Sequence, residues 1–364
     1  MHIVFLADPL DTQEAGIHYF CVEVLRHLVK KKEAHNITII RQKKLKNFPE
    51  ATEIGIGTIP LLGRYDPIRK FYTIPKKVRA LKPDIVVEMA HFGPFGLPKN
   101  IKRITVIHDV TPIRFSNCYH FIPALLQRIF LPRILKKAWK VITPSLKTEE
   151  DLHNLYPITK GKTVPILNTV SEIFKPTIDP KVMQKHQLIE DYFLHVGTLE
   201  PRKNHLQLLK AYEIYHQKTK HPKKLILVGS KGWKSKRIHH ALQQHPFTSD
   251  IRLLGYVDRH DLPALYTQCE AFILPSIYEG FGLPLLEAMK CGAYCISSNT
   301  SSLPEVGGDA VQYFNPYHED DLAELMLKIT PIKRETYRKK AIVRGLEFDW
   351  NEYVRQLLLL LTSD

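Results

Sequence analysis

The feature that most constrains this chain is an alternation of short β-branched runs with helical patterns, which occurs once in each half. Between the runs, apolar residues recur at helical spacing, as in Tyr19–Val29. Strands that alternate with helices form parallel sheets covered on both faces, so the pattern predicts two doubly wound α/β domains that face each other across a cleft. The runs expected to form strands are Ile3–Leu6, Ile37–Ile40, Ile85–Val87, Ile104–Ile107 and Val141–Thr143 in the first half, and Phe193–Val196, Leu225–Val228, Ile251–Leu254, Ala271–Leu274 and Tyr294–Ser297 in the second.

The boundary between the two domains is predicted near residues 173–180, where two prolines flank a polar stretch. We expect residues 1–175 to form the first domain and residues 176–345 the second. The chain opens on an apolar run that soon meets Asp8, unlike a signal peptide, and it has no apolar run of membrane-spanning length. The five cysteines have neither disulfide nor zinc spacing, so a reducing, cytoplasmic location is expected.

Positive charge is concentrated in the first domain. Residues 1–175 contain 28 Lys and Arg against 15 Asp and Glu, a net charge of +13, whereas residues 176–364 contain 24 against 22, a net charge of +2. Two segments of the first half, Arg69–Arg79 and Arg128–Trp139, interleave cations with apolar and aromatic residues, as helices at a membrane interface do. We expect an anionic partner for this half, such as a membrane surface or a lipid-linked substrate. Ordinary surface helices packed on their own core are the competing interpretation.

The segment Ser276–Met289 combines two acids with a glycine turn and a helix start. Gly280 and Gly282 allow a tight turn and a close approach of the backbone to a ligand. The free N–H groups at the helix start attract phosphate, whereas Glu279 and Glu287 would repel it and suit hydroxyl groups instead. A ligand with phosphate at its centre and polyols on both sides is a nucleotide sugar. Taken alone, the same residues fit an ordinary helix start equally well.

Glu279 and Glu287, with Gly-Phe-Gly-Leu-Pro between them, resemble the signature of retaining glycosyltransferases of family 4. That family has the GT-B fold of two Rossmann-like domains, and matching segments run through most of the chain. The resemblance implies that Glu279 holds hydroxyls of the donor sugar and Glu287 those of the ribose. It also implies that residues from about 346 onward form a last helix that packs back on the first domain. The other donor-binding residues that this loop implies are Gly280, Phe281, Gly282 and Leu283.

A second polar segment, Gly197–Asn204, directly follows a predicted strand, where parallel α/β proteins bind ligands. Arg202 suits a bidentate contact with phosphate and Lys203 a point-charge contact, although a solvated pair that opens a helix is the alternative. The segment resembles the family's phosphate-binding motif, which implies that the pair stabilises the departing diphosphate. Many members have arginine after the glycine, where this chain has Thr198. Either Arg202 supplies both contacts, or phosphate binding is weaker than in those members.

Three further sets of contacts are implied by the resemblance. His108 matches a family histidine that reaches the donor sugar, although a histidine at such a position is more often structural. Gly16 would let the start of the first helix approach phosphate or acceptor. Tyr256 and Val257 lie in the loop that usually contacts the nucleotide base through its backbone.

Together these features predict a metal-independent glycosyltransferase that moves a hexose from a nucleotide sugar to a hydroxyl of a glycan or lipid-linked acceptor. The resemblance to family 4 implies that the transfer retains the anomeric configuration. GDP-mannose is the first expected donor, because His108–Pro112 and Glu200–Asn204 most resemble bacterial mannosyltransferases of surface-polysaccharide synthesis; UDP-glucose is the second. A nucleotide-sugar epimerase of the same architecture is the main alternative, and a basic nucleic-acid-binding protein is a weaker one. We expect no cofactor, no metal and no nucleic-acid partner, with peripheral contact at the inner face of the cytoplasmic membrane.

Overall fold

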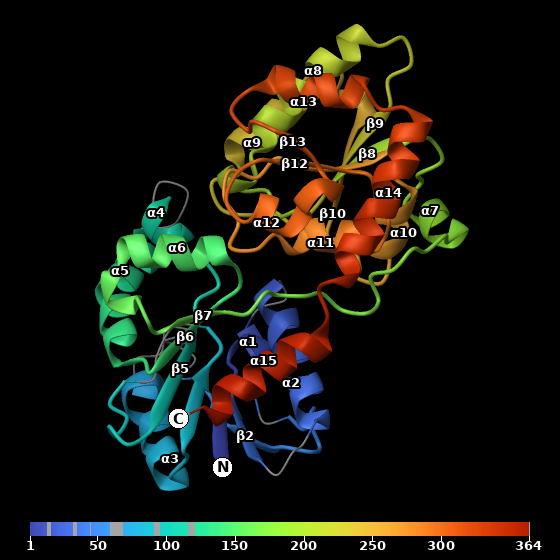
Figure 1. Ribbon diagram of the computed structural model, residues 1–364. Helices are drawn as coiled ribbons and strands as arrows, with labels where there is room; N and C mark the ends of the chain where they lie inside the picture. Colours follow the sequence, from blue (N-terminus) through green and yellow to red (C-terminus); the bar gives the residue numbers. More distant parts are fainter. Residues whose placement is uncertain are drawn as a thin grey trace. The chain divides into compact units, whose positions relative to one another are not determined.

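The computed structural model describes residues 1–12, 16–31, 35–43, 45–58, 68–90, 95–115 and 121–363. They divide into two compact units (Figure 1). The first unit comprises Met1–Arg114, Phe121–Thr169 and Asp349–Asp364, and the second is built from Val170–Phe348. No helix among the described residues combines the length and the apolar character that crossing a membrane requires.

In the described part of the first unit, seven parallel strands form one sheet in the order β3-β2-β1-β4-β5-β6-β7. Alternate residues of a strand point to opposite faces. Phe5 of the central strand therefore joins the core shared with Val24 and Leu357, whereas Val4 joins a core with Val78 on the other face. The strands are β1 (His2–Leu6), β2 (Asn36–Arg41), β3 (Thr52–Gly55), β4 (Ile85–Glu88), β5 (Lys102–Val106), β6 (Lys140–Thr143) and β7 (Thr163–Pro165).

The helices of the first unit begin and end at residues that favour those positions. The Ser145 hydroxyl caps α6 by accepting a hydrogen bond from the Thr148 N–H at 3.0 Å. Helix α3 has Pro75 in its first turn and ends at Lys82, whose φ of 46° is left-handed. The helices are α1 (Pro9–Thr12), α2 (Gly16–Lys30), the π-helix η2 (Arg69–Thr73), α3 (Ile74–Leu81), α4 (Thr111–Arg114), α5 (Phe121–Lys137), α6 (Leu146–Leu155), η4 (Pro157–Thr159) and α15 (Trp350–Thr362).

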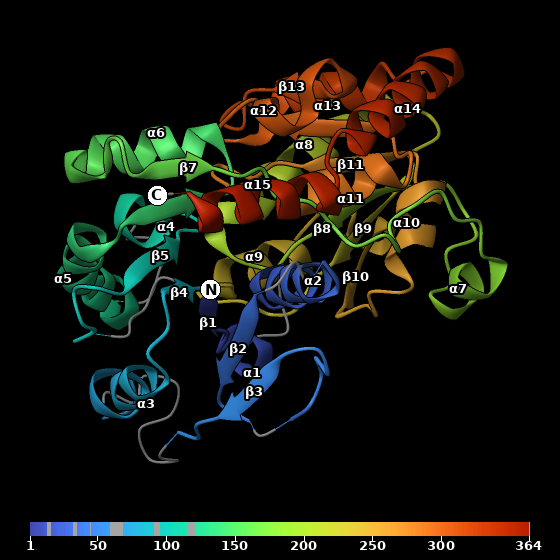
Figure 2. The ribbon, with the colours of Figure 1, turned by 60° about the horizontal axis from the view of Figure 1, so that its bottom comes forward.

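The last helix, α15, belongs to the first unit and packs along α2 (Figure 2). The Asp349 carboxylate caps it by accepting hydrogen bonds from the backbone N–H groups of Asn351 and Glu352. Trp350 is 3% exposed, and its ring stacks on His27 of α2 with centroids 5.4 Å apart. The segment Phe348-Asp349-Trp350 therefore leads into a helix whose apolar face completes the core of the first unit.

One cation of the predicted interfacial segments, Arg69, does not face solvent. Arg69 is 2% exposed, because its guanidinium donates to both carboxylate oxygens of Asp8 and to the Ile56 carbonyl. The expectation that Arg69 contributes surface charge is therefore wrong. Lys76 and Lys77, on the neighbouring α3, are exposed.

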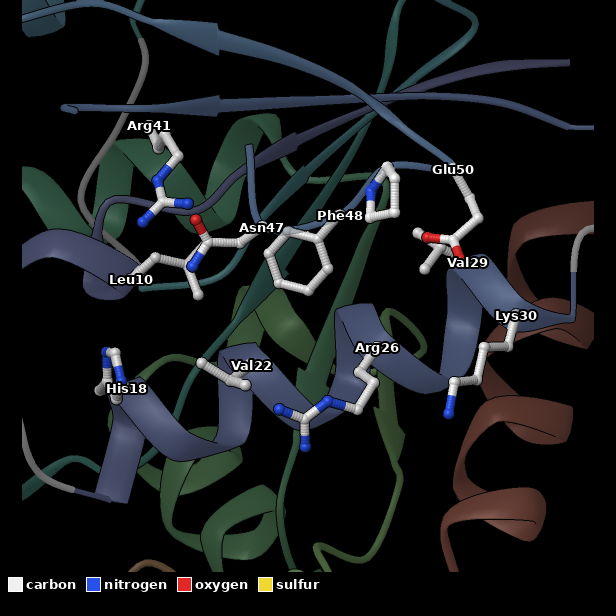
Figure 3. Close-up of a pocket in the computed structure, with 11 residues that line it drawn as sticks. Leu10, His18, Val22, Arg26, Val29, Lys30, Arg41, Asn47, Phe48 and Glu50 are labelled. Atoms are coloured by element: carbon white, nitrogen blue, oxygen red, sulfur yellow. The ribbon is translucent and has the colours of Figure 1, made fainter. Parts of the chain in front are cut away.

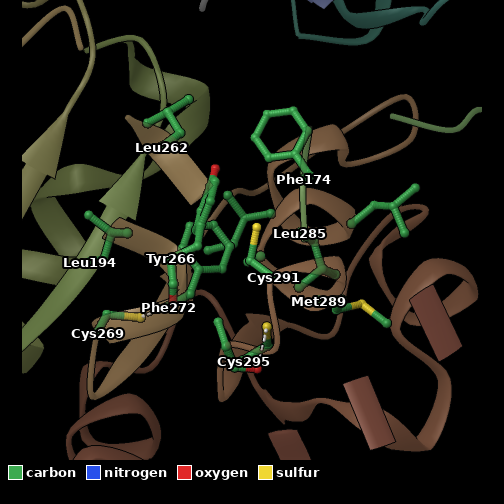
Figure 4. Packing of buried hydrophobic residues seen from close by; sticks show 14 of the residues in the cluster. Phe174, Leu194, Leu262, Tyr266, Cys269, Phe272, Leu285, Met289, Cys291 and Cys295 are labelled. Atoms are coloured by element: carbon green, nitrogen blue, oxygen red, sulfur yellow. Dashed lines mark hydrogen bonds between the residues drawn. The ribbon is translucent and has the colours of Figure 1, made fainter. Parts of the chain in front are cut away.

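The described part of the second unit has six parallel strands in the order β10-β9-β8-β11-β12-β13. The side chains of β8 again alternate: Leu194 joins the core on one face with Tyr266 and Leu285 (Figure 4), and Phe193 joins the core on the other face with Tyr212. The strands are β8 (Tyr192–Val196), β9 (Lys224–Val228), β10 (Ile251–Gly255), β11 (Ala271–Leu274), β12 (Cys295–Ser298) and β13 (Gln312–Phe314).

Three helices of the second unit, η5, α10 and α11, carry residues of the candidate functional site that is described in the next subsection. Helix α11 packs on both α10 and α14. The helices are α7 (Pro180–Lys185), η5 (Pro201–Lys203), α8 (His205–Lys218), α9 (Lys236–Gln243), η6 (Thr248–Asp250), α10 (Leu262–Gln268), α11 (Leu283–Lys290), α12 (Leu303–Gly307), η7 (Gly308–Ala310), α13 (Glu319–Leu327) and α14 (Pro331–Leu346).

Both sheets confirm the predicted doubly wound α/β architecture, since each begins with the strand order 3-2-1-4-5-6 of a Rossmann-type sheet. All ten predicted strands are present, with ends displaced by one or two residues. Sequence analysis missed three strands: β3, β7 and β13. Each has only three or four residues and lies at the edge of its sheet, so its sequence shows too little apolar pattern to be recognised.

Candidate functional site

Strand order locates the candidate site in the second unit. A doubly wound sheet binds ligands outside the carboxyl ends of its strands, at the point where the strand order reverses. Here that point lies between the adjacent strands β8 and β11. The segment after β8 carries Arg202 and Lys203, and the segment after β11 carries Glu279. The fold thus brings together two motifs that are far apart in the sequence.

Arg202 and Lys203 both bind Glu279 directly. The Arg202 Nη1 atom lies 2.6 Å from Glu279 Oε2, and the Lys203 Nζ atom lies 2.6 Å from Glu279 Oε1. The second terminal nitrogen of the guanidinium, Nη2, lies 2.6 Å from Glu200 Oε1. Three predicted site residues therefore form one ion cluster. Glu200 is a fourth member that sequence analysis did not single out.

Burial and the neighbouring cations have opposite effects on the pKa values of the two acids in this cluster. Glu279 and Lys203 are each 7% exposed, and Glu200 is 1% exposed. Burial by itself would raise the pKa of Glu279, but Arg202 and then Lys203 outweigh it and hold that pKa at about 2. Burial raises the pKa of Glu200, and Arg202 opposes the rise. Glu279 is consequently an anion at neutral pH, shared by two cations.

Serine hydroxyls hold the Glu279 loop in place. Ser276 Oγ donates to Glu279 Oε1 at 2.6 Å, and Ser302 Oγ donates to the Glu279 carbonyl at 3.0 Å. Ser301, whose φ of 57° is left-handed, also donates to that carbonyl. Sequence analysis missed these serines. The hydroxyl-rich run that begins at Ser297 was the available signal, but serines are common in any loop.

The glycine turn leads into α11 as predicted. Gly282 has a φ of 105°, and a Cβ atom there would lie only 2.6 Å from Leu303 Cδ2, so both backbone conformation and space require glycine. Helix α11 begins at Leu283 with a proline in its first turn, which confirms the predicted helix start. Gly280 and Phe281, which precede the turn, are buried.

Glu287 lies one turn inside α11 and is partly buried. Its Oε2 atom accepts a hydrogen bond from the Tyr266 hydroxyl at 3.0 Å. Burial raises the pKa of Glu287 to about 7, although Arg259 and the Tyr266 hydrogen bond lower it. This carboxyl therefore changes charge near neutral pH, unlike that of Glu279.

Thr198, Tyr256 and Val257 lie in the segments after β8 and β10. Thr198 is half-buried against Gly232, where a Cβ atom would meet its methyl group at 2.7 Å. Tyr256 is 63% exposed, whereas Val257 is buried. The Gly229 N–H donates to the Gly255 carbonyl at 2.8 Å, which ties the segments after β9 and β10 together.

The other two predicted residues, His108 and Gly16, belong to the first unit. His108 Nε2 donates to the Met89 carbonyl at 2.8 Å, and its ring meets the edge of Phe20 with centroids 5.1 Å apart. Burial lowers the pKa of His108, so the ring is neutral at pH 7 and its Nδ1 atom is a hydrogen-bond acceptor. Gly16 is exposed and opens α2.

The first unit also contains a pocket of about 340 Å³ between α2 and the segment after β2 (Figure 3). Arg26 and Lys30 line it from α2, and Asn47 and Phe48 line it from the opposite side. Its mixture of cations, an amide and an aromatic ring suits a polar ligand. Within the described part of the chain, no three His, Cys, Asp or Glu side chains gather where they could hold a metal ion.

Both halves of the chain match models of known glycosyltransferases. Residues 15–172 match the model described as Glycosyltransferase Family 4, and residues 180–344 match Glycosyl transferases group 1. The chain is also 30% identical to O-antigen chain mannosyltransferase B of Escherichia coli over 380 residues, which span 98% of each protein. The chain belongs to glycosyltransferase family 4. A further relative of this family 4 glycosyltransferase is the O-antigen chain mannosyltransferase RfbU of Salmonella typhimurium, which is 25% identical over 70% of this chain and 68% of its own length.

Its fold resembles that of solved glycosyltransferases. WaaG, a glycosyltransferase involved in lipopolysaccharide biosynthesis, matches with a TM-score of 0.77 at 14% identity, over 100% of both chains. This likeness confirms the predicted GT-B fold. The family assignment confirms the predicted glycosyltransferase class and does not favour the alternative of an epimerase.

Proposed function

We propose that this glycosyltransferase moves a hexose from a nucleotide sugar to a hydroxyl of a glycan or lipid-linked acceptor, with retention of anomeric configuration. The observation that carries the proposal is the cluster of Arg202, Lys203 and Glu279 at the switch point of the second unit. The first candidate donor is GDP-mannose, supported by relatives named as mannosyltransferases, and the second is UDP-glucose.

In this proposal the protein itself supplies the positive charge that the leaving group needs. Arg202, Lys203 and the Leu283 N–H at the start of α11 bind the diphosphate of the donor. The bond between sugar C1 and the phosphate oxygen breaks, and the diphosphate leaves with the electron pair, stabilised by these groups. The acceptor oxygen bonds to C1 on the same face, and its proton passes to the leaving phosphate oxygen. No metal ion is required for this step.

The two acids bind hydroxyl groups of the donor. Glu279 Oε1 accepts hydrogen bonds from Lys203 and Ser276, whereas Oε2 accepts one from Arg202. A carboxylate oxygen has two lone pairs, so Oε2 has room for one sugar hydroxyl. Glu287 accepts hydrogen bonds from the ribose. In the free protein Glu279 pairs with both cations, so the diphosphate competes with it for them.

The resemblance of the segment around His108 to the family's histidine segment supports a contact between His108 and the donor sugar. The Nε2 atom of His108 is committed to the Met89 carbonyl, so the neutral ring presents Nδ1 as an acceptor for a sugar hydroxyl. The base binds through the backbone of the segment that contains Tyr256 and Val257.

Donor identity can be tested by calorimetric titration with GDP-mannose, UDP-glucose and ADP-glucose. We expect GDP-mannose to bind most tightly, and Lys203→Met to weaken its binding at least about tenfold through loss of a charged contact. If UDP-glucose binds more tightly, UDP-glucose becomes the proposed donor in place of GDP-mannose. If none of the three nucleotide sugars binds, the proposed site is contradicted. Incubation with donor alone separates a transferase, which hydrolyses it slowly, from an epimerase, which turns it over.

We also propose that the first unit contacts an anionic membrane surface. The two predicted interfacial segments pack against each other, because Phe95 contacts Phe71 of η2 at 4.5 Å and Phe130 of α5 at 5.2 Å between ring centroids. Apolar and cationic groups thus stand on one surface, as interfacial binding requires. Among the side chains that the structure describes, the exposed apolar ones of η2, α5 and the residue before η2 are Ile68, Phe71, Tyr72, Leu125 and Ile129.

Sedimentation with lipid vesicles tests this surface. We expect the protein to bind vesicles with anionic lipid more than neutral ones and to be released by high salt. Reversal of charge at Lys76 and Lys77 should weaken binding at least about tenfold, since each cation contributes on the order of 1 kcal/mol. The same reversal at Lys218 and Lys220 of the second unit is the control. The proposed surface would be contradicted if reversal of the two lysine pairs weakened binding equally. It would also be contradicted if the protein bound neutral and anionic vesicles equally.

A further inference from the structure

Glu287 has a buried hydrogen-bond donor that neither the motif nor the family assignment singles out. Tyr266 of α10 is fully buried, and its hydroxyl lies 3.0 Å from Glu287 Oε2 on α11. Its ring meets Phe272 edge-on at 5.2 Å and Phe174 at 6.2 Å between centroids, so packing fixes the position of the hydroxyl (Figure 4). The hydrogen bond uses one lone pair of Oε2 and leaves Oε1 for other donors.

Two cations act on Glu287 besides this hydrogen bond. Arg259, in the loop after β10, lies over the Phe174 ring at 5.2 Å, and it lowers the pKa of Glu287, as Lys203 does to a smaller extent. Burial outweighs them and leaves that pKa raised, at about 7. Cys291, at the end of α11, is uncharged, because burial raises the pKa of its thiol. Near pH 7 Glu287 is therefore present in both its ionised and its neutral form. The loss of one hydrogen-bond donor would shift the equilibrium between these two forms.

Three cations of α11 and α14 donate to backbone carbonyls near α11. Arg338 and Arg344 of α14 donate to the Gly292 and Val306 carbonyls, at 2.6 and 3.1 Å. Lys290 of α11 itself donates to the Phe348 carbonyl at 2.7 Å. Glu305 of α12 accepts from Arg344 through its carbonyl, and burial keeps the Cys295 thiol of β12 neutral by raising its pKa.

We propose that Tyr266 is a positioning residue for Glu287, whose carboxylate it holds in the ionised, outward-facing form that binds nucleotide hydroxyls. The inference rests on the proposed function, in which Glu287 binds the ribose. A hydroxyl that donates to a carboxyl group favours its ionised form, which is the stronger acceptor. The Tyr266 O–H stabilises that form by donating to Oε2, and it directs Oε1 toward the ligand.

The pH dependence of nucleotide affinity tests the proposal. Titration calorimetry with GDP, and with UDP as a second probe, is run between pH 6 and pH 9. Affinity of the wild-type protein should rise with pH as Glu287 ionises. In Tyr266→Phe the rise should move to higher pH by about one unit, so that affinity falls about fivefold at pH 7 and returns near the wild-type value at pH 9.

Three controls separate this effect from general damage. Tyr212→Phe removes another buried hydroxyl, which donates to the Lys223 carbonyl at 2.9 Å, and should leave the profile unchanged. Glu287→Gln should remove the protein's contribution to the profile, and any pH dependence that remains belongs to the nucleotide. In the Glu287→Gln background, Tyr266→Phe should cause no further pH-dependent change. A loss in Tyr266→Phe that is equal at every pH, or no loss, would overturn the proposal.

Failure of the proposed function gives a different result. If Glu287→Gln binds both nucleotides as the wild-type protein does, Glu287 is not the ribose contact, and the proposed role of the site fails. The carboxyl carbon of Glu287 can still be followed by NMR in the free protein, assigned by its absence in Glu287→Gln. It should titrate at higher pH in Tyr266→Phe than in the wild type. An unchanged midpoint would show that Tyr266 does not control the carboxylate.

Discussion

Replacement of Glu279 by glutamine removes the shared anion of the ion cluster and nearly preserves its shape. The Glu279 carboxylate accepts three hydrogen bonds of 2.6 Å, from Arg202, Lys203 and Ser276. The amide of Glu279→Gln offers one oxygen in place of two and turns its NH₂ group toward a cation. Lys203, which is 7% exposed, then has no carboxylate partner at the site.

The expected cost follows from breaking a buried ion pair. Removal of one partner typically destabilises a protein by about 3–5 kcal/mol. Arg202 keeps Glu200 as a second partner, so we expect the lower end of this range. A loss of about 3 kcal/mol should lower the Tm of the transition that includes the second unit by about 6–12 °C, given about 2–4 °C per kcal/mol for a domain of this size.

Calorimetry and urea unfolding at several pH values check this prediction. Glu279 has a folded-state pKa of about 2, below its ordinary value of 4.5, so its contribution is present above pH 4.5 and is lost as the pH falls toward 2. The gap between wild type and Glu279→Gln should therefore be the same at pH 7 and pH 5. Glu335→Gln, which removes an exposed partner of Lys339, is the control and should change little. A Glu279→Gln variant within about 1 kcal/mol of wild type would refute the reasoning, because a buried pair should cost more.

Three other predictions concern the α11 turn, the last helix and the leaving group. Gly282→Ala should destabilise the second unit by at least about 2 kcal/mol in urea unfolding, because alanine is strained at this φ and its Cβ atom would clash with Leu303. Trp350→Ala should destabilise the first unit by about 3–5 kcal/mol, as for other buried aromatic residues; a smaller effect would mean that α15 contributes little to that core. Transfer should continue in EDTA, since Arg202 and Lys203 supply the charge; complete loss that magnesium reverses would contradict the proposed mechanism.

The local parts of the fold and the site could be predicted from the sequence. Gly282 and the proline after Leu283 act through backbone conformation, which depends on neighbouring residues alone. The start of α11 could therefore be predicted from the sequence, and so could the placement of Glu287 one turn inside the helix. The central strands could also be predicted from local sequence, because burial on both faces makes their sequences almost continuously apolar.

Contacts between distant segments could not be predicted in the same way. Lys203 and Glu279 are 76 positions apart, and they meet only because β8 and β11 are adjacent in the sheet. Arg69 has the local pattern of a surface cation, yet it pairs with Asp8, 61 positions earlier. Strand order decides both contacts, and a local pattern carries no information about the partner. The hydrogen bond from Tyr266 to Glu287 is another pairing of this kind.

The return of α15 to the first unit reverses the order in which the two units can be completed during synthesis. Domains usually fold as units, the N-terminal one first, while the chain is being made. Here the ribosome has finished Val170–Phe348 before it makes any of α15. Until then, the face of α2 around Phe20 lacks the cover that Tyr353 and its neighbours provide, and apolar surface stays open to solvent and to chaperones. The half of the molecule that is made first is the half that is finished last.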